Sequence, residues 1–112
     1  MLRRKKTADA LQGTLDLLVL KTLRRGPEHG YGIGAHIEGV SDEVLRVEEG
    51  SLYPALHRME QAGLIASDWC VTANRRRARL YRITRAGQRH LDEQEARWER
   101  LTKAVGKVLR FA

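Results

Sequence analysis

The clearest helix signal in this chain of 112 residues is the segment Glu49-Gly50-Ser51-Leu52-Tyr53-Pro54-Ala55-Leu56-His57-Arg58-Met59-Glu60. Its apolar residues recur at helical spacing and form one stripe, made of Leu52, Ala55, Leu56 and Met59. The other face carries hydrogen-bonding or flat groups, namely Tyr53, Pro54, His57, Arg58 and Gln61. We expect Ser51 to be the N-cap and the helix to span residues 51–62, which places Pro54 in the first turn. Such a helix suits insertion into a DNA major groove, although an ordinary amphipathic surface helix has the same pattern.

A basic hairpin is predicted directly after this helix. Residues 64–72 alternate apolar and polar side chains, and residues 80–83 form a second β-type run. The turn between them carries Arg75, Arg76 and Arg77, and we expect an arginine-rich wing over residues 72–80. Between Arg75 and Arg89 there are seven arginines and no acidic residue. The loop is therefore expected to contact phosphate, with a solvated loop as the alternative.

Two further helices are predicted before the first segment. The earlier one has Leu11, Leu15 and Leu18 along one stripe, and further apolar residues widen that stripe nearly around the helix. A second subunit is therefore expected to cover part of it. The next helix opens near Tyr31, with Ile33, Ile37 and Val40 facing the core, and residues 44–47 are a weak candidate for a third strand. Helix, helix, recognition helix and wing is the order of a winged helix-turn-helix, a mainly α fold with a small β wing (α+β).

A long final helix is predicted from a Thr84 cap to about Arg110. Its apolar residues keep the three- and four-residue spacing of a heptad seam, and they are Leu91, Trp98, Leu101, Val105 and Val108. An exposed stripe of this kind usually marks an interface, so we expect a homodimer. Two recognition helices about 34 Å apart would then read a roughly palindromic operator. The expected organisation is a basic tail (1–10), a winged domain (11–84) and a dimerisation helix (85–112).

Charge and composition favour a polyanionic partner. The net charge is +7, but residues 41–63 are acidic on balance, so the tail and the wing would supply most of the attraction to phosphate. The single cysteine, Cys70, and the lack of an apolar run near 20 residues fit a cytoplasmic protein away from the membrane. No His or Cys pair has metal-ligand spacing, His36 is expected to be solvated, and no catalytic constellation is evident. We therefore expect neither an enzyme nor a cofactor.

Several motifs resemble the PadR family of bacterial transcriptional regulators. They are Leu11-Gln12-Gly13-Thr14-Leu15-Asp16, His29-Gly30-Tyr31-Gly32, the segment from Glu49 to Met59, Gly63-Leu64-Ile65 and Tyr81-Arg82-Ile83-Thr84-Arg85-Ala86-Gly87. The resemblance implies a homodimeric repressor that pairs through its first and last helices, and the single C-terminal helix resembles the smaller of the family's two size classes. It also implies a set of DNA-contacting residues, with Tyr31 as a less certain backbone contact: Tyr31, Ser51, Tyr53, Pro54, His57, Arg58, Arg75, Arg76 and Arg77.

Some members of that family bind flat aromatic compounds between the subunits. The resemblance places Trp98 in such a pocket, near Leu101 and Leu15, although Trp98 also fits as a large packing residue of a dimer interface. For Arg58, three roles stay open: a bidentate guanine contact, a phosphate contact, or a salt bridge to Glu49 or Glu60. Two other functions also stay open, namely general binding of RNA or DNA without operator specificity, and a protein-interaction module with an idle wing.

Overall fold

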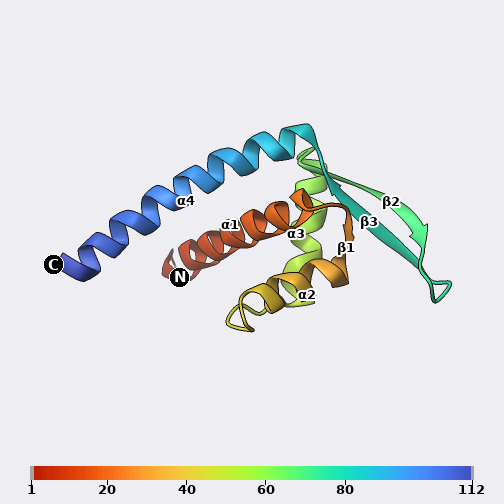
Figure 1. The fold of residues 1–112 in the computed structure, drawn as a ribbon, viewed down its shortest axis with the longest axis horizontal. Helices are drawn as coiled ribbons and strands as arrows, with labels where there is room; N and C mark the ends of the chain where they lie inside the picture. The colour runs from red at the N-terminus through yellow and green to blue at the C-terminus, as the bar shows by residue number, and fades with distance from the viewer. Residues whose placement is uncertain (1, 112) are drawn as a thin grey trace.

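The structure, a computed structural model, describes residues 2–111, with side chains described from Gly13 to Phe111. Its elements follow the order α1 (Leu2–Arg24), β1 (Glu28–His29), α2 (Gly30–Val40), α3 (Glu49–Gln61), β2 (Ile65–Val71), β3 (Arg77–Ile83) and α4 (Arg85–Phe111). In Figure 1, the first three helices gather at the middle and the β2–β3 hairpin projects to one side. On the other side, α4 runs alongside α1 and extends beyond it. The predicted α+β winged helix-turn-helix with a long last helix is confirmed.

The core is formed where α1, α2 and α3 meet. All four residues of the α3 stripe are buried, and they pack with Leu20 and Leu23 of α1 and with Ile33 and Ile37 of α2. The prediction for Val40 is wrong, because its side chain is 70% exposed. Val40 is the last residue of α2, where the chain leaves the core for the connection to α3.

The start of α3 lies two residues earlier than predicted. Glu48 is the N-cap, and its carbonyl accepts hydrogen bonds from the N–H groups of Ser51 and Leu52 at 3.0 and 2.9 Å. Ser51 is therefore inside the helix and not its cap, and Pro54 lies beyond the first turn. Having no N–H, Pro54 cannot bond the carbonyl four residues earlier. At the other end, Gly63 takes a φ of 78°, the left-handed conformation that ends a helix and favours glycine.

The sheet has the strand order β1-β3-β2, and both pairings are antiparallel. In the hairpin, Ile65 pairs with Ile83 at the base and Val71 pairs with Arg77 near the tip. The third strand is β1, not the predicted residues 44–47. The connection around those residues instead turns through positive φ angles at Asp42 and Glu43, and the N–H of Val47 donates to Glu38 Oε2 at 2.9 Å.

The α4 helix begins at a tight junction with the wing. Thr84 caps it as predicted, because its Oγ1 accepts the N–H of Gly87 at 3.0 Å. At Gly87 a Cβ would collide with the carbonyl oxygen of Leu64, so the backbone of α4 lies directly against the start of the wing. Further along, the pairs Lys21–Glu95 (2.9 Å) and Arg24–Asp92 (2.8 Å) tie α4 to α1. None of the described helices is long and apolar enough to cross a membrane.

Candidate nucleic-acid interface

The outer face of α3 is exposed as predicted. Its exposed residues are Ser51, Tyr53, Pro54, His57, Arg58 and Gln61. Tyr53 rests on the start of α2: a Cβ at Gly30 would lie 2.8 Å from Tyr53 Cε1 and 2.9 Å from its hydroxyl. Gly30 therefore supports Tyr53, a role that the sequence analysis missed. Tyr31, itself 83% exposed, lines the same hollow between α2 and α3 as Tyr53.

Arg58 is bound to α1 in this structure. Its two terminal nitrogens donate to the two carboxylate oxygens of Asp16, each at 2.8 Å. Bidentate pairing of this kind is the strong form of an arginine–carboxylate contact. The hydrogen bond raises the pKa of Arg58, and partial burial opposes the rise. Asp16 was not among the partners considered from sequence. Any contact of Arg58 with a base or a phosphate would compete with this carboxylate for the same N–H groups.

A polar network joins the end of α3 to the wing. Arg79 donates to Ser67 Oγ at 2.7 Å, and Ser67 Oγ donates to Glu60 Oε2 at 2.7 Å. Arg79 also lies 3.8 Å from Glu60 Oε1. Glu60 and Arg79 also help to line an open hollow between α3 and the wing, together with His57 and Tyr81. Burial raises the pKa of the Tyr81 phenol, which is 6% exposed. The wing and α3 therefore present one continuous surface.

The three predicted wing arginines lie in two different parts of the hairpin. Arg75 and Arg76 lie in the turn, where Arg75 has a φ of 58°, whereas Arg77 begins β3. The guanidinium carbons of Arg77 and Arg79 each lie 4.8 Å from the centroid of the Trp69 ring, within the range of a cation–π contact.

Side chains two apart on a strand share a face, so Arg77 and Arg79 lie on the face that Ser67 turns toward α3. Arg82 belongs to the opposite face and pairs with Asp68 at 2.6 Å. Sequence reasoning missed the cluster of Trp69, Arg77 and Arg79. The spacing of two residues between Arg77 and Arg79 already indicated that these arginines would share one face of the strand.

The residues predicted for the dimer interface differ in their exposure within one chain. Trp98, Leu101, Val105 and Val108 are exposed along α4, as an interface requires. The prediction for Leu91 is wrong, because Leu91 is fully buried within the single chain and cannot meet a second subunit. Leu15 and Leu18 are partly buried against the core, and the side chain of Leu11 lies outside the described residues.

Of the three residues predicted for the ligand pocket, only Trp98 and Leu101 lie together within one chain. Trp98 and Leu101 line a groove between α1 and α4, but there they meet Leu17. Leu15 instead lines a different hollow, with Leu18 and Val47. Among the described residues, no group of three or more His, Cys, Asp or Glu side chains could hold a metal ion. Cys70 is half-buried, and its Sγ lies 3.9 Å from Nε2 of His29.

The fold and this surface define a winged helix-turn-helix DNA-binding protein. The model of the PadR-like family of transcriptional regulators matches residues 19–93. The chain therefore belongs to that family, whose members are regulators of transcription rather than enzymes.

Solved structures and a curated relative agree with this assignment. A PadR family regulator from Eggerthella lenta is 35% identical, with 99% of this chain and 95% of that chain covered and a TM-score of 0.73. A regulator from Clostridium thermocellum is 31% identical over 88% of this chain and 96% of its own, with a TM-score of 0.80. A transcriptional regulator of Mycobacterium tuberculosis is 45% identical over 60 residues, which cover 54% of this chain and 55% of that protein.

Proposed function

We propose that this regulator is a cytoplasmic homodimeric repressor that binds a roughly palindromic operator. One observation carries the proposal: the exposed polar face of α3 and the arginines Arg77 and Arg79 lie on one continuous surface. In this arrangement α3 enters the major groove, and the wing contacts the backbone beside it. The recognition residues are Ser51, Tyr53, Pro54, His57 and Arg58, with Arg75, Arg76 and Arg77 on phosphate and Tyr31 on the backbone.

The proposal of a homodimer rests on the last helix, α4. Its exposed stripe consists of Trp98, Leu101, Val105 and Val108, and the helix itself extends beyond α1 (Figure 1). Apolar surface of this extent normally marks a protein contact. A two-fold symmetric dimer presents two identical DNA-binding surfaces. The operator that it binds is therefore expected to have two similar half-sites related by the same symmetry.

Operator specificity is favoured over general nucleic-acid binding by the charge on α3. Glu49 and Glu60 lie on this helix, and Arg58 is already paired with Asp16. A protein that binds any nucleic acid by charge needs positive potential across the whole contact face. Here attraction to phosphate comes mainly from the wing, and α3 contributes shape and hydrogen-bonding groups.

The test is a competition experiment at physiological salt. A labelled fragment of the region upstream of the protein's own gene is bound, and excess unlabelled random duplex or structured RNA is added. We expect the upstream fragment to remain bound, because specific sites exceed random DNA by about a thousandfold or more. Equal displacement by random DNA and by RNA would favour the general nucleic-acid binder and reject operator specificity.

The wing is tested through salt dependence. Replacing Arg75, Arg76 and Arg77 by Ala is expected to weaken binding to all duplexes and to flatten the slope of log affinity against log salt by about one unit per lost phosphate contact. An unchanged slope would show that these arginines do not touch DNA.

An aromatic effector at the dimer interface is a further part of the proposal. It rests on Trp98 and Leu101, which line an open groove against α1, with Leu15 supplied by the second subunit. Planar aromatic compounds are expected to quench Trp98 fluorescence in a Trp69→Phe background. No quenching across such compounds would leave Trp98 as a packing residue of the interface.

A further inference from the structure

A single serine bridges the wing and α3. Ser67 of β2 is half-buried. Its hydroxyl donates to Oε2 of Glu60, on α3, at 2.7 Å and accepts an N–H of Arg79, on β3, at 2.7 Å. One oxygen atom therefore joins a carboxylate of the helix to a guanidinium of the wing. Both hydrogen bonds have a charged partner, and such bonds are stronger than those between neutral groups.

This bridge lies where the hairpin leaves the core. Ile65, two residues earlier on β2, is buried, and Tyr81, which pairs with Ser67 across the ladder, is 6% exposed. Further out on the same strand, Trp69 and Val71 are exposed, and in Figure 1 the outer part of the hairpin projects away from the helices. A hairpin that is fixed only at its base can pivot. A side-chain bond to α3 at this point therefore restrains the direction of everything beyond it.

The bridge also fixes the distance between the proposed DNA-contacting groups of the two elements. An open hollow of about 440 Å³ lies between α3 and the wing. Tyr53 and His57 line it from the helix, and Arg79 lines it from the wing. The guanidinium of Arg79 is held from two sides, by Ser67 and by the ring of Trp69. Without Ser67, only the longer contact of 3.8 Å with Glu60 would connect Arg79 to α3.

We propose that Ser67 is a positioning residue for operator recognition, which holds the wing at a fixed distance and angle to α3. This inference rests on the proposed DNA binding. An operator requires α3 and the wing to contact bases and phosphates in one register at the same time, so a wing that is already oriented loses less freedom on binding. Random duplex makes no such demand, because phosphates run along the whole backbone and charge alone attracts the arginines. Ser67 therefore contributes to specificity and not to the general attraction to DNA.

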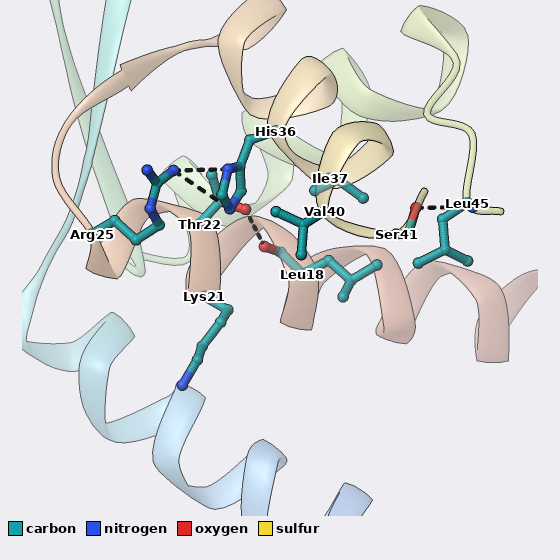
Figure 2. A pocket seen from close by; sticks show the side chains of 9 residues that line it. All are labelled: Leu18, Lys21, Thr22, Arg25, His36, Ile37, Val40, Ser41 and Leu45. Atoms are coloured by element: carbon teal, nitrogen blue, oxygen red, sulfur yellow. Dashed lines mark hydrogen bonds between the residues drawn. The ribbon is translucent and has the colours of Figure 1, made fainter. Parts of the chain in front are cut away.

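Ser41 provides a matched control elsewhere in the chain. It is also half-buried, and its hydroxyl donates to the carbonyl of Glu38 at 3.2 Å and accepts the N–H of Leu45 at 3.1 Å, the contact drawn in Figure 2. Ser41 is the C-cap residue of α2 and lies beside an aliphatic hollow between α1 and α2. Ser41→Ala and Ser67→Ala each remove one bridging hydroxyl without changing the net charge, but only Ser67→Ala unties the wing from α3.

The experiment measures the affinity of each variant for the labelled upstream fragment and for random duplex, by fluorescence anisotropy at several salt concentrations. We expect Ser67→Ala to bind the upstream fragment about threefold to tenfold more weakly, the size expected when a hydrogen-bonded bridge is lost. Its affinity for random duplex should change by less than about twofold, and the slope against log salt should stay the same, because every wing arginine is retained. Ser67→Thr keeps the hydroxyl and should match the parent, as should Ser41→Ala.

A second measurement follows the wing in the DNA-free protein. Nitrogen relaxation by NMR should give lower order parameters for the backbone amides of residues 69–79 in Ser67→Ala, and parental values in Ser41→Ala and Ser67→Thr. Unchanged order parameters would show that the wing is held without Ser67. Equal losses of affinity on the upstream fragment and on random duplex would show that Ser67 acts on folding or on general binding. Either result would overturn the proposal.

The role of Ser67 and the proposed function can fail separately. If the parent protein binds the upstream fragment no better than random duplex, the proposed operator specificity fails, and the order parameters still decide whether Ser67 holds the wing. If the parent prefers the upstream fragment and Ser67→Ala keeps the same preference, the proposed function stands and the positioning role of Ser67 is rejected.

Discussion

The guanidinium of Arg58 is held by a carboxylate that lies 42 residues earlier in the chain. The contact joins α1, a helix proposed for the dimer, to α3, the helix proposed for DNA recognition. Asp16 is the less exposed partner, with 19% of its side chain accessible. The pair therefore orients Arg58 and also links the two helices.

The strength of this pair can be measured against another α1 pair. We expect Asp16→Asn to lower the free energy of unfolding by about 1 kcal/mol, because a bidentate contact with a mostly buried carboxylate is lost. Asp92→Asn breaks the pair with Arg24, in which Asp92 is 62% exposed, and should lower it by less than about 0.5 kcal/mol. Urea unfolding followed by circular dichroism measures both. Equal losses would show that the Asp16 pair is an ordinary surface ion pair.

Because the phenol of Tyr81 is buried, we expect the free energy of unfolding to fall at alkaline pH. Burial raises the pKa of its phenol above the ordinary value of about 10, so the folded protein retains this proton when the unfolded chain has lost it. The stabilisation is fully present below pH ~10 and declines as the pH rises above that value. Urea unfolding at pH 9 and pH 11 should show a smaller decline for Tyr81→Phe than for the parent. Tyr31→Phe, at an exposed site, should decline as the parent does; an equal decline in all three proteins would refute the assignment to Tyr81.

At the scale of elements, the wing is organised around Trp69. Arg77 and Arg79 share a face of β3 and both rest on this ring, and Arg79 is also tied to α3 through Ser67. Replacing Trp69 by Leu leaves the net charge unchanged but removes the surface on which both guanidinium groups rest. We expect the affinity for random duplex DNA to fall about threefold to fivefold, in line with cation–π contacts at exposed sites. Fluorescence anisotropy measures it, and Val71→Ala, an exposed change on the same strand, is the control. A Trp69→Leu protein with parental affinity would mean that the ring does not position the arginines for DNA.

The junction between the wing and α4 depends on a glycine. A Cβ at Gly87 would collide with the carbonyl of Leu64 and lie 2.8 Å from Ile83 Cγ1, so the backbone at the start of the wing would have to move. Gly87→Ala should therefore lower the free energy of unfolding by about 2 kcal/mol or more. Gly106→Ala, in the same helix, meets nothing closer than the end of Arg110 at 3.9 Å and should raise stability by about 0.5–1 kcal/mol. Thermal unfolding of the two variants tests the contrast, which similar effects in both would contradict.

For the molecule as a whole, the proposed homodimer depends on the exposed apolar stripe of α4. Leu101 is 54% exposed on α4. A glutamate there would place a charge in the proposed interface, so Leu101→Glu should be monomeric at micromolar concentration in sedimentation velocity experiments. Lys103→Glu introduces the same residue away from the seam and should stay dimeric, like the parent. A dimeric Leu101→Glu protein would place the interface elsewhere.

Much of this architecture could be predicted from local patterns. The stripe from Leu52 to Met59, the cap at Thr84 and the alternation along the hairpin each depend on residues within a few positions of one another. The family resemblance added only the proposed DNA-contacting roles of residues on the outer face of α3. The start of α3 was misplaced because Ser51 is a good N-cap residue, yet the chain reaches helical geometry at Glu49.

Local patterns therefore predicted the four helices, the two hairpin strands, their order and the outward face of α3, because helical and strand periodicities are local properties of the chain. Contacts between distant elements could be seen only in the folded chain: Asp16 holds Arg58, Leu91 is buried within one chain, and an aliphatic hollow opens between α1 and α2. Each of these depends on which side chains from distant elements meet, and that is set by the packing of the whole core. No spacing along the chain contains this information.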